Sequence, residues 1–133
     1  MRVGPPPALG RLLKRPDFLA AARGRRFHCG RLTAQGRSRD DPAPSESGLR
    51  IGYTVTRKVG HATERNRIRR RLRAAVAEAS QAFAAQASDV VVIGRREALS
   101  APFPVLLEDL ARALAAVTRT GERHEARRPR PPT

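Results

Sequence analysis

Arginine is the residue whose number and spacing in this chain most clearly indicate a chemistry. Eight Lys or Arg residues lie from Arg57 to Arg73, and Glu64 is the one acid among them. Guanidinium groups bind phosphates through paired N–H donors, whereas an ordinary solvated surface mixes charges of both signs. This segment therefore predicts a surface that binds a polyanion.

A helix is the element that would display these charges on one side. At 100° per residue an apolar stripe runs along the segment, formed by Ile68, Leu72, Ala75, Val76, Ala79 and Phe83. The surface that this stripe leaves free carries, over the first turns, Asn66, Arg67, Arg69, Arg70, Arg71 and Arg73. Arg65 lies in line with the stripe but one turn before it begins, so we expect it to project past the end of the core.

Residues that could hydrolyse a phosphodiester bond or hold a metal ion do not form a recognisable group in the sequence. The three histidines are far apart, and Asp40 and Asp41 lie in a segment typical of loops. Glu108 and Asp109 are expected on the outer face of an amphipathic helix. The sequence therefore predicts no catalytic residue and no metal ligand in the polypeptide.

The composition favours a nucleic-acid partner. Lys and Arg number 27 against 12 Asp and Glu, a net charge of +15, and counterion release rewards contacts with many phosphates more than contact with one small acidic substrate. Cys29 is the single cysteine, which excludes an internal disulfide. No apolar run is long enough to span a membrane, and residues 1–7 lack the apolar segment of a signal peptide, so a cytoplasmic location is expected.

The arginine-rich helix is expected to connect two parallel strands. Residues 49–58 alternate in character, which predicts a strand. One side is apolar and the other is small or hydroxylic: Ile51, Tyr53 and Val55 against Gly52, Thr54 and Thr56. Residues 90–94 are apolar on both sides, which predicts a central strand. A βαβ unit would place the two strands side by side.

The rest of the chain predicts fewer elements. Residues 16–24 form a short helix opened by Pro-Asp and ended by Gly, residues 27–34 a poor strand, and residues 36–48 a loop. A second amphipathic helix should begin with Ser100 as its cap and continue to about Val117.

These elements predict a single domain at residues 9–117, between a flexible lead-in at 1–8 and a basic, Pro-rich disordered tail at 118–133. The expected fold class is an α/β (α+β) sandwich, a mixed sheet of about four strands with helices packed on one side. Besides the function argued next, the residues also fit a ribosomal or other structural RNA-binding protein, or a DNA-binding helix module.

Two successive stretches resemble the protein component of bacterial ribonuclease P. They are Thr54-Val55-Thr56-Arg57-Lys58-Val59-Gly60 and Glu64-Arg65-Asn66-Arg67-Ile68-Arg69-Arg70, whose Arg-Asn-Arg segment is the signature of that family. The resemblance extends to the stretch from Arg11 to Phe18, to residues 24–27 and to residues 89–96. It covers about residues 9–117.

The resemblance implies a role for each of these surfaces. In that family an RNA subunit performs Mg²⁺-dependent removal of the 5′ leader from precursor transfer RNA. The Arg-Asn-Arg helix faces this catalytic RNA, and a cleft between the first helix and the open sheet face holds the leader. The residues implied at the catalytic RNA are Arg65, Asn66, Arg67, Arg69, Arg70 and Arg73. The residues implied in the leader cleft are Phe18, Thr54, Thr56, Arg57 and Lys58.

The same resemblance implies an endoribonuclease whose chemistry is carried by RNA, with Mg²⁺ bound mainly by the RNA subunit. The implied partners are the catalytic RNA and precursor transfer RNA, with no membrane and no obligate protein partner. A left-handed crossover through the arginine-rich helix is also implied, where the general rule for parallel strands favours a right-handed one. This chain departs from the family at Ala22, where many members carry a second aromatic residue.

Overall fold

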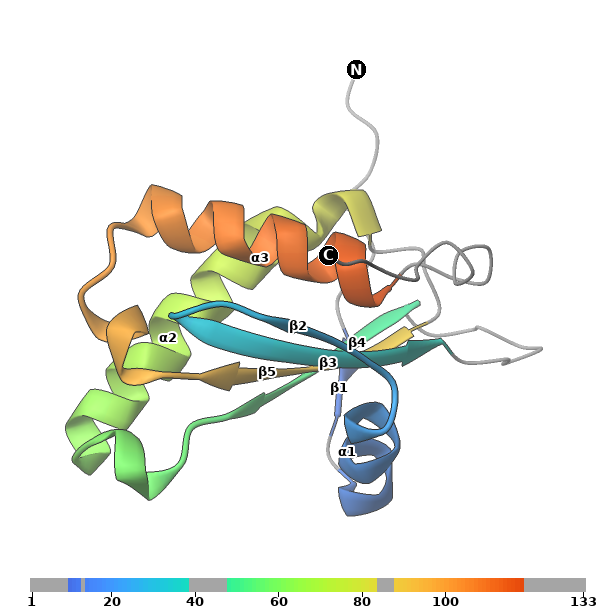
Figure 1. Cartoon of the computed structure of the whole chain (residues 1–133), viewed down its shortest axis with the longest axis horizontal. Helices are drawn as coiled ribbons and strands as arrows, with labels where there is room; N and C mark the ends of the chain where they lie inside the picture. Colours follow the sequence, from blue (N-terminus) through green and yellow to red (C-terminus); the bar gives the residue numbers. More distant parts are fainter. Residues whose placement is uncertain (1–9, 13, 39–47, 84–87, 119–133) are drawn as a thin grey trace, which may run out of the picture.

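One mixed sheet organises the fold. The computed structural model describes residues 10–12, 14–38, 48–83 and 88–118, and within these the strand order is β1-β4-β5-β3-β2 (Figure 1). The strands are Gly10–Arg11 (β1), Arg25–His28 (β2), Leu32–Ser38 (β3), Leu49–Thr54 (β4) and Ser88–Gly94 (β5). The predicted α/β class is confirmed, with five strands where about four were expected. The predicted lead-in at 1–8 and all but the first residue of the predicted tail lie outside the described residues.

Helices cover both faces of the sheet. They are Arg15–Ala22 (α1), Ala62–Ala79 (α2) and Phe103–Val117 (α3), and short 3₁₀ helices follow β4, α2 and β5 at Arg57–Val59 (η1), Ser80–Phe83 (η2) and Arg96–Leu99 (η3). Figure 1 shows α2 and α3 on one face and α1 on the other. The expectation that the helices lie on one side was wrong for α1, because β5 is apolar on both sides and its second face also needs cover.

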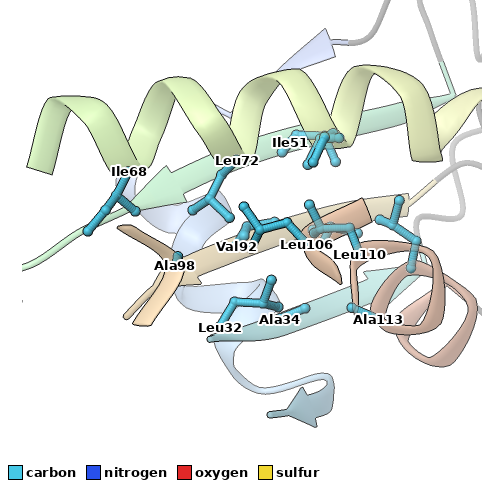
Figure 2. Close-up of a cluster of buried hydrophobic side chains, with 14 of the residues drawn as sticks. Leu32, Ala34, Ile51, Ile68, Leu72, Val92, Ala98, Leu106, Leu110 and Ala113 are labelled. Carbon is cyan, nitrogen blue, oxygen red and sulfur yellow. The ribbon is translucent and has the colours of Figure 1, made fainter. Parts of the chain in front are cut away.

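The larger apolar core lies between the sheet and the helices α2 and α3. Figure 2 shows Ile68 and Leu72 of α2 and Leu106 of α3 converging on Val92 of β5, and all four side chains are fully buried. A smaller cluster on the other face joins Leu12, Ala21 and Val91, with Phe18 packed against it. The sheet is thus the middle layer of three.

β4, α2 and β5 form the predicted βαβ unit. β4 and β5 are parallel neighbours, with Ile51 opposite Val90, and β5 is the central strand. The first strand of the unit is shorter than predicted, because it ends at Thr54. The N–H of Val59 donates to the carbonyl of Thr56 at 3.0 Å, which turns the chain into η1 before the predicted end of the strand at residue 58.

The segment that the sequence described as one poor strand and a loop is a hairpin. β2 and β3 pair antiparallel, and the N–H of Cys29 donates to the carbonyl of Leu32 at 2.9 Å across the turn. β3 continues to Ser38 and pairs with β5, so its last residues were wrongly assigned to the loop. The apolar side of β3 consists of Leu32, Ala34 and Gly36, and small residues give a weak alternation signal.

α3 begins later than predicted. Its first residue is Phe103 and its N-cap is Pro102, while Ser100 lies in the turn after η3. The N–H groups of Val105 and Leu106 both donate to the Pro102 carbonyl, at 3.0 and 3.2 Å, so this carbonyl accepts the first hydrogen bonds of the helix. The predicted end at Val117 is confirmed.

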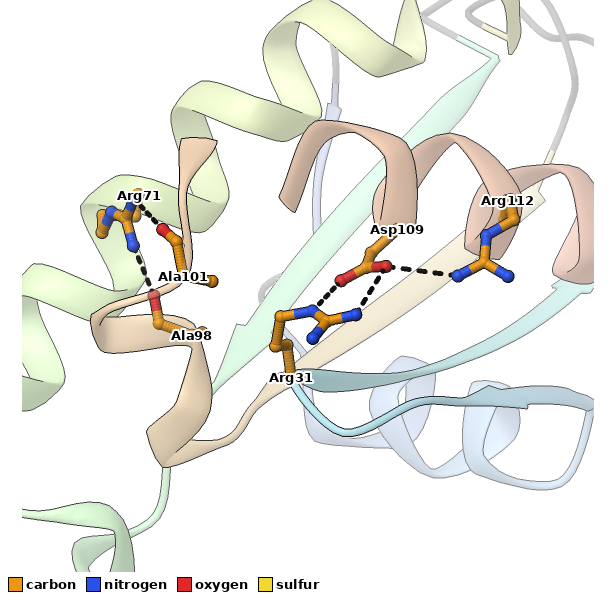
Figure 3. Close-up of polar contacts among 6 residues, drawn as sticks. All are labelled: Arg31, Arg71, Ala98, Ala101, Asp109 and Arg112. Atoms are coloured by element: carbon orange, nitrogen blue, oxygen red, sulfur yellow. Dashed lines mark hydrogen bonds and ion pairs between the residues drawn. The ribbon is translucent and has the colours of Figure 1, made fainter. Parts of the chain in front are cut away.

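Two acids, Asp109 and Asp89, are buried in ion pairs. Asp109 accepts hydrogen bonds from Arg31 and Arg112, which connects α3 to the β2–β3 turn (Figure 3). Asp89 is fully buried in β5 and accepts two 2.8 Å hydrogen bonds from Arg50 of β4. The prediction that Asp109 lies on the outer face of its helix was wrong, because its charge is matched by arginines that include one distant in sequence.

Candidate nucleic-acid interface

The position of α2 on the sheet fixes the direction of its arginines. Ile68 and Leu72 are fully buried and lie over Gly94 at the end of β5, where an added Cβ would come within 2.8 Å of Ile68 Cγ2 and 2.9 Å of Leu72 Cδ1. A side chain at position 94 would therefore force these two buried side chains to shift. With this edge against the sheet, the opposite edge of the helix faces solvent.

The exposed surface of α2 holds most of the residues that the resemblance assigned to catalytic RNA. Asn66, Arg67, Arg70 and Arg73 are exposed, while Arg65 and Arg69 are partly buried. The side-chain oxygen of Asn66 accepts a hydrogen bond from Arg69 at 3.1 Å, one turn further along the helix. The predicted set is therefore brought together on one element, but it does not form one flat face.

The arginines of α2 divide between two flanks of the helix. Arg69 and Arg73 are four residues apart and point to the side of the β4 edge, where both line a hollow with Phe18. Arg67 and Arg71 are also four residues apart and point to the side of α3, where both line a shallower hollow of about 450 Å³ with Phe103. Arg70 lies between the two flanks.

Arg71 is a structural residue and not part of the free basic surface. It donates to the carbonyl groups of Ala98 at 2.7 Å and of Ala101 at 2.5 Å, in the segment between η3 and α3 (Figure 3). Charge-assisted hydrogen bonds to main-chain carbonyls hold this segment against α2. Helical periodicity predicted an exposed position for Arg71. The periodicity of one helix cannot show that main-chain carbonyl groups from another segment lie beside it.

The start of α2 is held by Glu64. Its carboxylate accepts the N–H of the N-cap residue His61 at 2.9 Å and pairs with Arg96, at 3.0 Å, from η3. The hydrogen bond from Arg96, with a smaller contribution from the His61 N–H, lowers the pKa of Glu64 from its ordinary 4.5 to about 2. Arg96 also donates to the Val59 carbonyl, and Arg65 donates to the Gly60 carbonyl at 3.2 Å.

A hollow of about 520 Å³ lies at the β4 edge of the sheet, between α1 and α2. Its lining includes Phe18 of α1, Tyr53 of β4, and Arg69 and Arg73 of α2. We call it the β4-edge cavity. The rest of its lining comes from β1, the residue after β1 and the middle of β4: Gly10, Arg11, Leu12, Ile51 and Gly52.

Phe18 belongs to both the core and the cavity. Its ring packs against the cluster of Leu12, Ala21 and Val91 and lies so close to Gly52 that an added Cβ there would be 2.6 Å from Cζ. One side of the half-buried ring is left to line the cavity. The absence of a side chain at Gly52 thus provides the space that the ring occupies.

The other residues assigned to the leader cleft lie beyond the end of this cavity. Thr54 is the last residue of β4 and is half-buried, Thr56 is exposed just before η1, and Arg57 and Lys58 are exposed within η1. None of these four lines the cavity. The structure therefore brings together Phe18, Arg69 and Arg73, which the resemblance had divided between two surfaces.

Tyr53 is a cavity residue outside the predicted set. The Arg73 guanidinium lies over its ring at 5.5 Å from the centroid, and burial raises the pKa of Tyr53 to about 12, so the hydroxyl stays protonated. Alternation had placed Tyr53 on the apolar side of β4. Tyr53 lies at the edge of the sheet because β1 pairs with β4 only at Arg50 and Ile51, and the sequence does not show where β1 ends.

Two wider properties of the described part of the chain bear on function. No group of three His, Cys, Asp or Glu side chains there could hold a metal ion, and His28 bonds to the Thr33 hydroxyl at 2.7 Å. None of the helices in these ranges combines the length and the apolar character needed to cross a membrane.

A mixed sheet that displays an arginine-rich helix beside a cavity with aromatic rings defines a basic α/β protein of the nucleic-acid-binding kind. The family model described as Ribonuclease P matches residues 7–118. The chain therefore belongs to the ribonuclease P protein family, as its Arg-Asn-Arg motif predicted.

Individual relatives agree with this assignment. The chain is 43% identical over 122 residues to the ribonuclease P protein component of Paramagnetospirillum magneticum, an alignment that covers 91% of this chain and 92% of that protein. It is 46% identical over 104 residues to the component from Ruegeria pomeroyi, with 77% and 82% covered. The RNase P protein from Thermotoga maritima superimposes with a TM-score of 0.64 at 27% identity, over 78% of this chain and 94% of that one.

The ion pair of Glu64 gives a prediction on pH. Gln at position 64 keeps an acceptor for the His61 N–H but loses the charge that pairs with Arg96. Because the folded-state pKa of Glu64 is lowered to about 2, its stabilising contribution is complete above the ordinary value of 4.5 and is lost as the pH falls through 2. The difference in unfolding free energy between wild type and Glu64→Gln should be constant above about pH 5 and shrink below it.

Urea denaturation at a series of pH values measures this difference. Glu78, exposed on the same helix, provides the matched control, and Glu78→Gln should differ little from wild type over the whole range. A Glu64→Gln difference that stays the same from pH 5 to pH 2 would contradict the assigned role of the ion pair.

Proposed function

We propose that this protein is the RNA-binding subunit of a bacterial ribonuclease P, and that it assists removal of the 5′ leader from precursor transfer RNA. The exposed arginine edge of α2 is the observation that supports this most directly. Arg67, Arg70 and Arg73 are exposed there, and the one acid of the first turns, Glu64, is already paired with Arg96. Exposed guanidinium groups along one helix suit the phosphates of a folded RNA.

The polypeptide contributes binding, and the RNA subunit contributes the chemistry. Family membership supports a catalytic RNA as the partner. We further propose that Mg²⁺ is held mainly by that RNA and that no obligate protein partner is needed. Positive charge at the interface favours association of two phosphate-rich molecules, the catalytic RNA and the precursor, which would otherwise repel each other. A cytoplasmic location accompanies this proposal.

Leader binding is the second part of the proposal. Phe18 offers one ring face to the β4-edge cavity, and Thr54, Thr56, Arg57 and Lys58 follow the cavity residue Tyr53 in the chain, from the end of β4 into η1. Aromatic stacking and phosphate contacts bind unpaired nucleotides with little choice of sequence. Leaders of different precursors differ in sequence, so this mode of binding fits them.

The catalytic-RNA surface is tested by the double substitution Arg67→Ala and Arg70→Ala. Both side chains are exposed, so the fold should be retained. Affinity for the catalytic RNA should fall, and the slope of log K against log salt should flatten by about 0.7–0.9 for each RNA phosphate that the variant no longer neutralises. Filter binding at several salt concentrations measures both quantities.

The matched control removes two exposed arginines elsewhere, Arg23→Ala and Arg26→Ala, near the start of β2. This pair lowers the net charge equally but lies off α2, so its effect should be small. Equal losses of affinity for the two double variants would show that total charge, and not the α2 edge, determines binding.

The leader contact is tested by Phe18→Ala in the reconstituted holoenzyme. Affinity for a precursor with a leader of several nucleotides should fall by about 1–3 kcal/mol if a base stacks on the ring. Affinity for mature transfer RNA, which has no leader, should hardly change. Leu19→Ala, the exposed neighbour on α1, serves as the control.

Because Phe18 also packs against the smaller core, thermal stability is measured with affinity. A second variant, Gly52→Ala, keeps the ring but forces it to move, since the added Cβ would meet Cζ at 2.6 Å. It should weaken leader binding in the same way. Equal loss of affinity for precursor and mature RNA would assign Phe18 to packing alone.

A further inference from the structure

The two flanks of α2 face different parts of the molecule. Arg67 lines the hollow beside α3, whereas Arg69 and Arg73 line the β4-edge cavity with Phe18. At 100° per residue, Arg67 and Arg69 differ by 200° around the helix axis. The two side chains therefore point to nearly opposite sides of the helix, and one flat RNA surface cannot contact both. This geometry raises the question of what the β4-edge flank binds.

Within the described residues, the edge of β4 extends past the end of β1 without a further strand partner. β1 pairs with β4 only at Arg50 and Ile51, and no described strand pairs with β4 beyond them on this side. The Ile51 carbonyl accepts the Leu12 N–H at 3.1 Å, so the main chain of Ile51 faces β1. Alternate residues of a strand present their N–H and C=O to the same side. Tyr53 therefore presents its main-chain groups to the cavity, past the end of β1.

The charged side chains of the described cavity lining are all positive. Arg11, Arg69 and Arg73 belong to its lining, and among the residues that the structure describes no acid does. The Arg73 guanidinium is held over the Tyr53 ring, and the Arg69 guanidinium donates a hydrogen bond to the side-chain oxygen of Asn66. The cavity volume of about 520 Å³ lies within the roughly 300–1,000 Å³ typical of small-ligand sites.

These features match the chemistry of one unpaired nucleotide. A base can lie against Phe18, main-chain groups of the β4 edge can meet polar atoms of the base or sugar, and two guanidinium groups can hold the phosphate. A peptide strand would also find the main-chain edge, but three guanidinium groups favour an anionic chain.

We propose that Arg69 and Arg73 bind the phosphate of a leader nucleotide whose base lies against Phe18, so that α2 contacts two RNAs: the leader on this flank, and the catalytic RNA at Arg67 on the other flank and at Arg70 between the two. This rests on the proposed function. It reassigns two residues that the Arg-Asn-Arg resemblance placed at the catalytic RNA. This chain has Ala22 where many family members carry a second aromatic ring on α1. In this chain, Tyr53 and the arginines of α2 complete the lining of the cavity.

The test compares two double variants of the same helix with equal loss of charge, Arg69→Ala with Arg73→Ala, and Arg67→Ala with Arg70→Ala. Each protein is assembled with the full catalytic RNA at a protein concentration that saturates it. Affinity is then measured for precursors with leaders of one nucleotide and of several nucleotides. Binding of each protein to the catalytic RNA alone is measured separately.

The Arg69/Arg73 variant should lose about tenfold or more in affinity for the long-leader precursor, which corresponds to about 1.4 kcal/mol. It should lose little for the one-nucleotide leader and should bind catalytic RNA nearly as well as wild type. The Arg67/Arg70 variant should show the reverse pattern. Both results together would establish the division of α2.

The proposal is overturned if the Arg69/Arg73 variant binds catalytic RNA as weakly as the Arg67/Arg70 variant and keeps the full dependence on leader length. Phe18→Ala then tests the leader cleft separately from the assignment of Arg69 and Arg73. If Phe18→Ala still removes the leader dependence, the leader cleft stands and only the assignment of Arg69 and Arg73 fails. If Phe18→Ala leaves it intact as well, leader binding in this cleft fails too.

Discussion

The packing of α2 on β5 is the interaction on which the rest of this molecule depends. Six arginines lie on this helix, five pairs of them three or four residues apart, and like-charge neighbours at this spacing cost about 0.2–0.5 kcal/mol each. Full burial of Ile68 and Leu72 contributes about 3–6 kcal/mol. The apolar stripe therefore outweighs the repulsion only while the helix lies against the sheet, and Gly94 permits that close approach.

Polar contacts at the edges of α2 complete this arrangement. Glu64 holds the first turn to η3 through Arg96, and Arg71 holds the segment before α3 through main-chain carbonyls. These contacts use one acid and one arginine of the helix and leave most of the other arginines facing outward. Packing in the core thus determines which charges remain available, and the available charges determine that the partner is a polyanion.

The sequence predicted α2 and β5, at the centre of the fold, better than the β2–β3 hairpin and the β4 edge at the two sides of the sheet. The stripe of Ile68 and Leu72 and the apolar run of β5 are strong periodic signals, and both elements are where they were expected. The hairpin of β2 and β3 was missed because Ala34 and Gly36 on the inner side of β3 are small and give a weak alternation signal. Asp109 was predicted on the outer face of its helix, and only Arg31, which reaches it from the β2–β3 turn, explains its burial. The β4-edge cavity depends on where β1 stops, which no local pattern records.

The central claim is that the polypeptide binds and positions RNA while the RNA subunit cleaves. The most direct measurement is cleavage of a precursor transfer RNA at limiting Mg²⁺ by RNA-free protein, by catalytic RNA alone, and by the two together. We expect no cleavage by the protein, slow cleavage by the RNA, and faster cleavage by the complex. Metal-dependent cleavage by rigorously RNA-free protein would contradict the account.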